Sequence, residues 1–148
     1  MKAWIFRFAN IIGGRMTHGL IFDLIQKLKK NSRELEILGD GCQCKSYLLV
    51  EECINAILFT VKNAQEQINL FNLASQDNIR VSLIAKILVK MMGFNSVRYR
   101  FTGGKRGWKG DVPLMLLDVS RINKLGWKAK YNSGEAVFSC IRSSICKQ

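Results

Sequence analysis

The sequence predicts an α/β fold in which parallel strand pairing dominates. Short apolar runs alternate with segments of helical periodicity, and glycine-containing turns separate the two. The chain has 148 residues, of which 48% are hydrophobic, so a core can form and wholesale disorder is excluded. Its longest apolar runs are far shorter than the roughly 18 residues that a membrane-spanning helix requires. We therefore expect one α/β unit over residues 1–148 and no contact with a membrane.

The first half of the chain supplies strands and two amphipathic helices. Ala3–Ile12 is an apolar run that ends at Gly13–Gly14, which predicts a buried strand. Leucine and isoleucine recur at helical spacing in His18–Lys30, with lysines in the last turn and Thr17 as the candidate N-cap. The remaining elements of this half are an extended segment at Leu35–Leu38, a second one at Lys45–Leu49 and a helix over Val50–Val61.

The second half continues the alternation. Ile68–Leu73 alternates as a strand does, and Ser82–Met92 has the spacing of a helix that Gly93 ends. The later elements are a strand at Val97–Phe101, a weaker extended run at Leu114–Leu117, a short helix at Ser120–Leu125 and a last helix at Ala136–Ile145. Strands that alternate with helices in this way favour parallel pairing.

The positive charge of the chain is concentrated in its second half. The formal net charge is +12, of which residues 61–148 carry +10. A basic cluster interleaved with aromatic residues comprises Arg98, Arg100, Lys105, Arg106 and Lys109 together with Tyr99, Phe101 and Trp108. Such a stretch suits single-stranded nucleic acid, a single nucleotide diphosphate or a solvated surface loop, and charge alone leaves all three open.

The cysteines indicate an intracellular protein without a metal centre. There are five, an odd number, and the apolar start of the chain lacks the features of a secretory signal. We therefore expect reduced thiols in a cytoplasmic protein. Cys42 and Cys44 are too close in sequence for an ordinary bridge, and His18 is the only histidine, so we expect no metal site.

A series of short motifs follows one another in a characteristic order. The motifs are Arg7–Phe8–Ala9–Asn10, Gly13–Gly14–Arg15, Gly39–Asp40–Gly41-x-Gln43, Tyr47 with Val50–Glu51–Glu52, Phe71–Asn72–Leu73–Ala74–Ser75, Gly107–Trp108–Lys109–Gly110–Asp111–Val112–Pro113, Leu117–Asp118 and Leu125–Gly126–Trp127. This series resembles the C-terminal half of the extended short-chain dehydrogenase/reductases, the NAD-dependent nucleotide-sugar epimerases and dehydratases similar to UDP-glucose 4-epimerase. The resemblance covers nearly the whole chain. It implies the last strands of a Rossmann-type parallel sheet plus a small α/β substrate-binding region, with the N-terminal nucleotide-binding part missing.

Two features of that family are absent from the chain. The family binds NAD through a Gly-x-x-Gly-x-x-Gly turn, and the sequence has no such run. None of the three tyrosines is followed four residues later by a lysine, so the family's catalytic Tyr-x-x-x-Lys pair is missing as well. We therefore expect no catalytic residue here, no cofactor bound by this chain alone, and no activity of the chain by itself.

The resemblance implies a set of residues that bind a nucleotide sugar, most simply a UDP-sugar. Asn10 corresponds to the family's asparagine beside the phosphates, with a turn-forming residue as the alternative. His18, Gly19 and Leu20 open a helix whose free N–H groups suit a diphosphate, with ordinary capping as the alternative. Lys45 stands where the family most often has an arginine that contacts the diphosphate or ribose.

Two further site residues lie near the basic cluster. Arg106 corresponds to a late arginine that reaches the diphosphate in the family, and Asp111 lies near the ribose. The sequence thus favours a substrate-binding half, completed by a separate chain that carries the nucleotide-binding half. A non-catalytic remnant or a sugar-nucleotide binding module is the first alternative, and a basic RNA-binding protein is the second.

Overall fold

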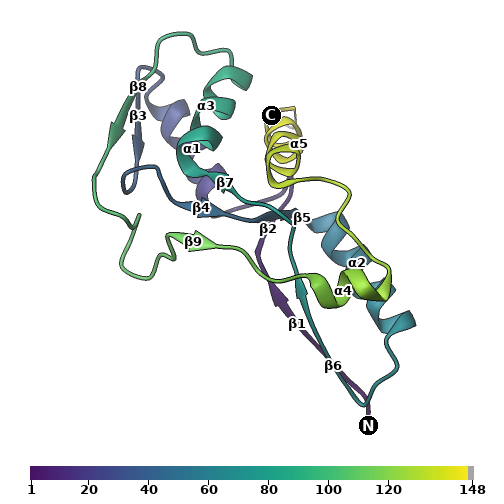
Figure 1. Cartoon of the computed structure of the whole chain (residues 1–148). Coiled ribbons are helices and arrows are strands. Elements are labelled where there is room, and N and C mark those ends of the chain that lie inside the picture. Colours follow the sequence, from purple (N-terminus) through teal and green to yellow (C-terminus); the bar gives the residue numbers. More distant parts are fainter. Residues whose placement is uncertain (147–148) are drawn as a thin grey trace.

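The computed structural model describes residues 1–146 as an elongated α/β molecule. In chain order the elements are β1 (Ala3–Phe8), β2 (Asn10–Ile12), α1 (Leu20–Lys30), β3 (Glu34–Ile37), β4 (Cys44–Lys45), β5 (Tyr47–Leu49), α2 (Val50–Asn63), β6 (Ile68–Leu73), β7 (Ile79–Arg80), α3 (Val81–Met91), β8 (Arg98–Phe101), β9 (Leu114–Met115), α4 (Ser120–Leu125) and α5 (Ser133–Ile145). Helices α1, α3 and α5 gather around β3 and β8 at one end, while β1, β6, α2 and α4 form the other end (Figure 1). None of the helices within residues 1–146 combines the length and the apolar character needed to cross a bilayer.

The strand predicted over Ala3–Ile12 is divided in two at Ala9. The first part, β1, pairs in parallel with β6, and the second part, β2, pairs in parallel with β5. The Ala9 N–H donates to the Leu73 carbonyl, whereas the next N–H, that of Asn10, donates to the Ser46 carbonyl. The partner strand therefore changes between Ala9 and Asn10, and a crevice can open where β5 and β6 diverge.

Parallel pairing dominates the remaining strands, which confirms the predicted α/β class. Strand β3 pairs in parallel with β8, and β4 pairs in parallel with β9. The exception is β7, a two-residue strand that the sequence did not predict, which lies antiparallel to β4. Strands β4, β7 and β9 lie between the two ends of the molecule (Figure 1).

Two apolar clusters correspond to the two ends. The first packs α1, α3 and α5 around β3, with Leu28, Leu35 and Leu88 fully buried. The second packs α2 and α4 against β6, with Leu73 and Ile122 at its centre. Helices α1, α3 and α5 turn apolar residues toward the first cluster, and α2 and α4 turn apolar residues toward the second. In α2, however, Ile54, Leu58 and Val61 of the predicted apolar pattern stay exposed.

Three helix starts differ from the prediction, and that of α3 differs by a single residue, since α3 begins at Val81 rather than Ser82. Helix α1 begins at Leu20, and its N-cap is Gly19 rather than Thr17, because the backbone at Gly19 has a φ of 95° that favours glycine. Helix α5 begins at Ser133, three residues earlier than predicted. Asn132 and Glu135 form a reciprocal capping box there, which fixes that start. Helix α4 has the predicted bounds.

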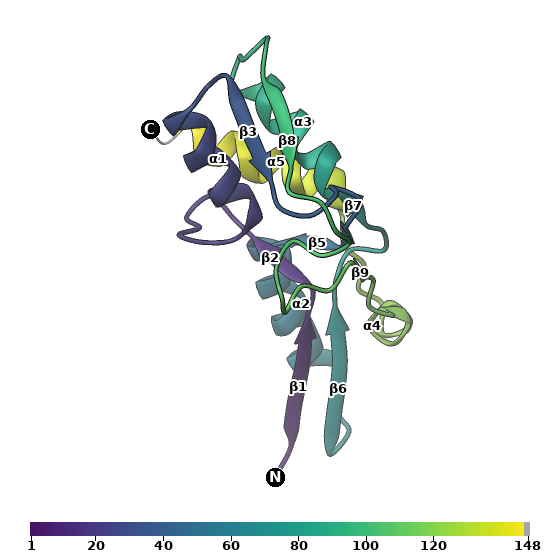
Figure 2. The same cartoon turned by 90° about the vertical axis from the view of Figure 1, so that its left-hand side faces the viewer.

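The β1–β6 pair is covered by helices on one face only. Helix α2 lies behind the two strands in Figure 2, and no helix lies in front of them. Ile5 and Ile68 belong to the uncovered face and are 49% and 64% exposed. The total exposed surface is 9096 Å². A compact monomer of this size exposes about 7,700 Å², so the elongated shape leaves extra surface in contact with water.

Candidate functional site

A cavity of about 570 Å³ lies next to β2, which begins where the first strand changes its partner. Its walls come from β2, the start of α1, the β4–β5 segment and the turn that precedes β9. Six of the residues predicted from the sequence line it: Asn10, His18, Gly19, Leu20, Lys45 and Asp111. The fold thus brings together residues from four separate stretches of the chain, and the volume falls within the range of small-molecule sites.

Asn10 lies at the point where the strand changes its partner. It stands opposite Tyr47 in the β2–β5 register, and its side-chain Nδ2 donates to the Ser46 carbonyl over 3.0 Å. Asn10 is therefore a strand residue rather than a turn residue. One hydrogen of its amide is used within the protein, and the other is left for a group in the cavity.

The start of α1 forms a second wall of the cavity. Gly19 is exposed, and no atom lies within 4 Å of the position that a Cβ would take there. No side chain caps the helix, so its first N–H groups remain without a side-chain acceptor. Asp23 in the first turn partly offsets the positive end of the helix dipole, but Lys27 pairs with it over 2.9 Å.

Lys45 and Asp111 form an ion pair inside the cavity lining. Asp111 is buried and also accepts a hydrogen bond from the Gly107 N–H over 2.9 Å. Burial by itself would raise the pKa of the Asp111 carboxyl. The bonds from Lys45 and Gly107 outweigh that effect and hold the pKa below its usual value. The carboxylate is therefore charged at neutral pH, and it ties the turn before β9 to β4.

Arg106 is the one predicted site residue that does not line the cavity. Its side chain is exposed, and its neighbour Gly107 is the first lining residue of the turn. Elsewhere in the basic cluster, Arg100 is paired with Glu34 and Glu36 on β3. The positive charge available near the cavity mouth is thus carried by the loop that contains Arg106, and the role of Arg106 stays a prediction.

Several lining residues were not predicted as site residues, and four of them bear on the chemistry of the cavity. Gln43, Tyr47, Leu38 and Trp108 all face the cavity. Gln43, Tyr47 and Trp108 stand within the family motifs, so a signal for all three was present in the sequence. Burial, followed by the nearby charge of Asp111, raises the pKa of Tyr47 above its usual range, so this phenol stays neutral.

The glycines between β2 and α1 differ from the turn that holds a dinucleotide in the family. A dinucleotide approaches glycines between a strand and a helix, where side chains would block it. Such glycines occur after β2, but a Cβ at Gly13 would lie 2.7 Å from Val50 and one at Gly14 would lie 2.9 Å from Ser143. These glycines therefore pack against the protein's own side chains. Within residues 1–146, no group of three side chains is placed to bind a metal ion either.

Comparisons with known proteins point to one group of relatives, although no protein-family model matches the chain. The chain is 25% identical over 137 residues to a protein of Methanocaldococcus jannaschii assigned as a UDP-glucose 4-epimerase, covering 90% of this chain and 42% of that protein. It is 28% identical over 96 residues to the GDP-L-fucose synthase of Sinorhizobium fredii, covering 65% of this chain and 29% of that protein.

Solved structures agree with these relatives. A UDP-galactose 4-epimerase is 32% identical, with a TM-score of 0.83, and the match covers 99% of this chain and 46% of that one. The UDP-glucose 4-epimerase of Thermotoga maritima, solved with UDP-glucose, has a TM-score of 0.76 at 23% identity, covering 96% of this chain and 45% of that one. The chain thus spans less than half the length of each of these relatives.

The order of the motifs, the parallel α/β topology and the similarity to solved epimerases agree with one another. The relatives belong to one group by sequence and by structure. By both criteria, this chain is therefore related to the UDP-glucose 4-epimerase-like members of the extended short-chain dehydrogenase/reductase family, and it corresponds to their C-terminal portion.

Proposed function

We propose that the chain binds a nucleotide sugar, most simply a UDP-sugar, in the cavity between β2, α1 and the turn before β9. It would act as the substrate-binding half of an NAD-dependent epimerase or dehydratase. The observation that carries the proposal is the convergence of six residues from four stretches of the chain on one cavity. A nucleic-acid surface would need no such enclosed space.

The cavity offers complementary groups to a diphosphate and to a ribose. The free amide hydrogen of Asn10 and the first N–H groups of α1 are donors for phosphate oxygens. Arg106 would reach the same phosphates from the loop at the cavity mouth, with a fork that can donate two hydrogen bonds. The charge of Lys45 is largely committed to Asp111, so its proposed role is to orient that carboxylate toward the ribose hydroxyls.

The chemistry of the family would come from groups outside this chain. In the family, NAD supplies hydride transfer, and this sequence lacks the Gly-x-x-Gly-x-x-Gly turn that binds it there. The role proposed for this chain is therefore to bind and orient the substrate. Catalysis would require a nucleotide-binding half, carried on the same polypeptide or on a separate chain.

The β1–β6 pair offers a docking surface for such a half. Ala3 and Ala9 both donate their N–H groups to the β6 side. Successive residues of a strand point their N–H and C=O groups to opposite edges. The N–H groups of Trp4, Phe6 and Phe8 therefore face the open edge of β1, where another parallel strand could pair. A two-stranded parallel pair with one bare apolar face is typical of a sheet that continues in another segment.

Helix α2 extends this docking surface. Ile54, Leu58 and Val61 follow one another at helical spacing and are exposed, while Cys53 and Ala56 on the opposite side are buried. A helix of the nucleotide-binding half would cover this stripe. The length of the relatives supports this occupant, because more than half of each lies outside the matched region.

A binding panel tests the proposal. The full chain is titrated calorimetrically with UDP-glucose, UDP-galactose and UDP, and in parallel with a single-stranded oligouridine RNA. The proposal expects the nucleotide sugars to bind at one site per chain, without turnover when NAD is added. Binding of the RNA alone would favour the basic RNA-binding alternative, and NAD-dependent epimerisation by the purified chain would contradict the assignment of a substrate-binding half.

A further inference from the structure

Trp108 and Leu38 are the two exposed large apolar side chains of the cavity lining. Trp108 is 66% exposed, whereas the other large apolar residues of the lining, apart from Leu38, are buried or half-buried. An indole ring in water forfeits the stabilisation that burial would provide. Its position at the wall of a cavity indicates that a ligand covers it.

The turn that carries Trp108 is fixed by hydrogen bonds. The Gly107 N–H donates to the Asp111 carboxylate, and the Asp111 N–H donates to the Trp108 carbonyl over 3.0 Å. Lys45 anchors the same carboxylate to β4. One part of the indole lies against Gly110, where a Cβ would clash with the ring. The backbone is therefore held in place, and the ring is supported from one side while most of its surface stays open.

Gln43 supplies an independent sign of a ligand at this end of the cavity. Its side chain is 2% exposed and lines the cavity, and its Nε2 donates to the Leu38 carbonyl over 3.0 Å. Its Oε1 is buried and has no donor in the described part of the chain. Buried acceptors without a partner are uncommon in folded proteins. A Cβ at Gly107 would lie 3.5 Å from Nε2 of this same amide, so the Gln43 side chain lies next to the turn that presents Trp108.

We infer that Trp108 is a stacking platform for the nucleobase of the bound ligand, an inference that rests on the proposed function. A flat heterocycle matches an exposed indole, because aromatic rings stack with an offset over one another. Leu38 adds an apolar contact, and Gln43 offers an acceptor for an N–H on the edge of the base, directly or through one water. A hexose ring would instead need several polar partners, and those lie on β2 and α1.

The test compares three variants of the full chain. Trp108→Ala removes the platform, Trp108→Phe retains a smaller ring, and Val112→Ala shortens an exposed side chain of the same loop that does not line the cavity. Calorimetry with UDP is expected to give an affinity about tenfold weaker for Trp108→Ala. The affinity should stay within about threefold of the unmodified chain for Trp108→Phe, because a phenyl ring still stacks. Val112→Ala should bind as the unmodified chain does.

Fluorescence provides a readout specific to stacking. With excitation at about 295 nm, the indoles dominate the emission, and UDP should quench part of it as the base covers Trp108. The quench should vanish in Trp108→Phe although UDP still binds. Equal UDP affinity in Trp108→Ala, or a quench that persists in Trp108→Phe, would overturn the platform while leaving the proposed function in place. An unmodified chain that binds neither UDP nor UDP-glucose would instead contradict the proposed function, and the platform with it.

Discussion

Lys45 on β4 forms an ion pair with Asp111, which lies 66 residues later in the chain and comes before β9. Because the pair connects two walls of the cavity, it fixes the position of the turn that carries Gly107 and Trp108. The same contact therefore serves both stability and the geometry of the proposed site. The first two predictions test the contribution of this pair to stability.

Replacing Lys45 with methionine should destabilise the fold. The substitution leaves the Asp111 carboxylate buried with only backbone donors, and an unmet charged group of this kind costs about 2 kcal/mol. Urea unfolding followed by circular dichroism measures the change in the free energy of unfolding. Lys128→Met is the matched control, because Lys128 is exposed and should tolerate the same change. Equal stability of both variants would contradict a structural role of the pair.

Stability should depend on pH through Asp111. The pKa of its carboxyl is lowered in the folded chain, so the unfolded chain takes up this proton first as the solution is acidified. The stabilisation is therefore complete above the ordinary value near 3.8 and is lost as the pH falls through the lowered pKa. Urea unfolding between pH 5 and about 2 should show this loss, and Asp111→Asn should flatten it. If the free energy of unfolding changed equally with pH in the unmodified chain and in Asp111→Asn, a group other than Asp111 would cause the pH dependence.

Charge reversal at Arg106 should weaken nucleotide-sugar binding more than charge reversal at Lys128. Both changes alter the net charge equally, but Arg106 adjoins the cavity lining, whereas Lys128 lies outside the basic cluster. Loss of a forked contact to a diphosphate should reduce the affinity for UDP-glucose about tenfold or more. Calorimetry on Arg106→Glu and Lys128→Glu makes the comparison. Losses of the same size would mean that general electrostatic attraction, rather than a site, holds the ligand.

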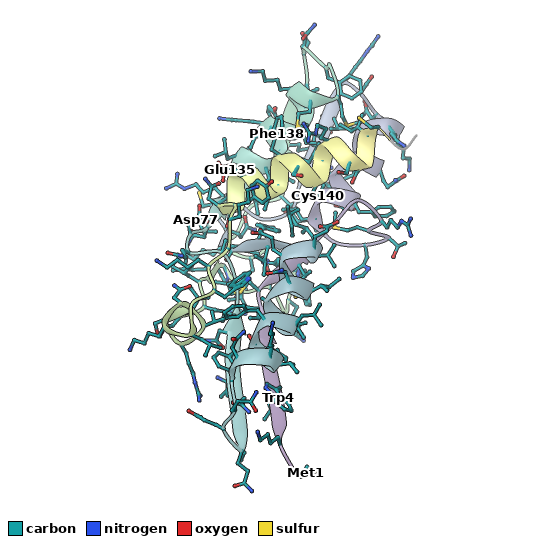
Figure 3. All side chains as sticks on the ribbon, turned by 90° about the vertical axis from the view of Figure 1, so that its right-hand side faces the viewer. Met1, Trp4, Asp77, Glu135, Phe138 and Cys140 are labelled. Carbon is teal, nitrogen blue, oxygen red and sulfur yellow. The ribbon has the colours of Figure 1, made fainter. Side chains whose placement is uncertain are left out.

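The open edge of β1 should exchange its amide hydrogens rapidly. The N–H groups of Phe6 and Phe8 face that edge, whereas those of Ile5 and Arg7 face β6. Hydrogen exchange followed by NMR should therefore show faster exchange at the even-numbered residues of β1. Trp4 lies on the same strand, and its indole donates to the Ala64 carbonyl on the side of α2 (Figure 3). Uniform protection along β1 in the isolated chain would show that another segment already occupies the edge.

The bare face of the β1–β6 pair should promote association. Ile5 and Ile68 lie on this face, and an exposed apolar face beside an open edge is a template for self-pairing. Sedimentation velocity should show association that grows with concentration, and Ile5→Lys should reduce it. A strictly monomeric chain with a sharp, reversible thermal transition would contradict this expectation, because it would show that the surface needs no cover.

The spacing of apolar residues predicted some elements with the bounds that the structure shows. Ile68–Leu73 and Ser120–Leu125 have the predicted bounds, and Ile68–Leu73 pairs with β1 along its whole length. The change of partner at Ala9 was not predictable. Strands β5 and β6 are both distant in sequence, and the residues of Ala3–Ile12 do not indicate which of the two strands each part pairs with. The two-residue strand β7 is too short to produce any periodicity.

The sequence contained a signal for the start of α5. Asn132 and Glu135 have the spacing of a capping box, and Ser133 sits in the first turn of α5, where its N–H donates to Asp77 (Figure 3). The prediction began the helix later because the apolar pattern starts only at Ala136. The Lys45–Asp111 pair had no such local signal, because long-range ion pairs follow from the fold and not from spacing.

The most direct test of the nucleotide-sugar site is an NMR titration of the ¹⁵N-labelled full chain with UDP-glucose. The proposed site predicts saturable shifts that cluster at Asn10, Gly19, Leu20 and Gly107, together with the indole N–H of Trp108. The groove between α3 and α5, lined by Leu83 and Phe138, should stay unchanged and serves as the internal control. Shifts confined to that groove, or no saturable shifts at millimolar ligand, would contradict a nucleotide-sugar site in this cavity.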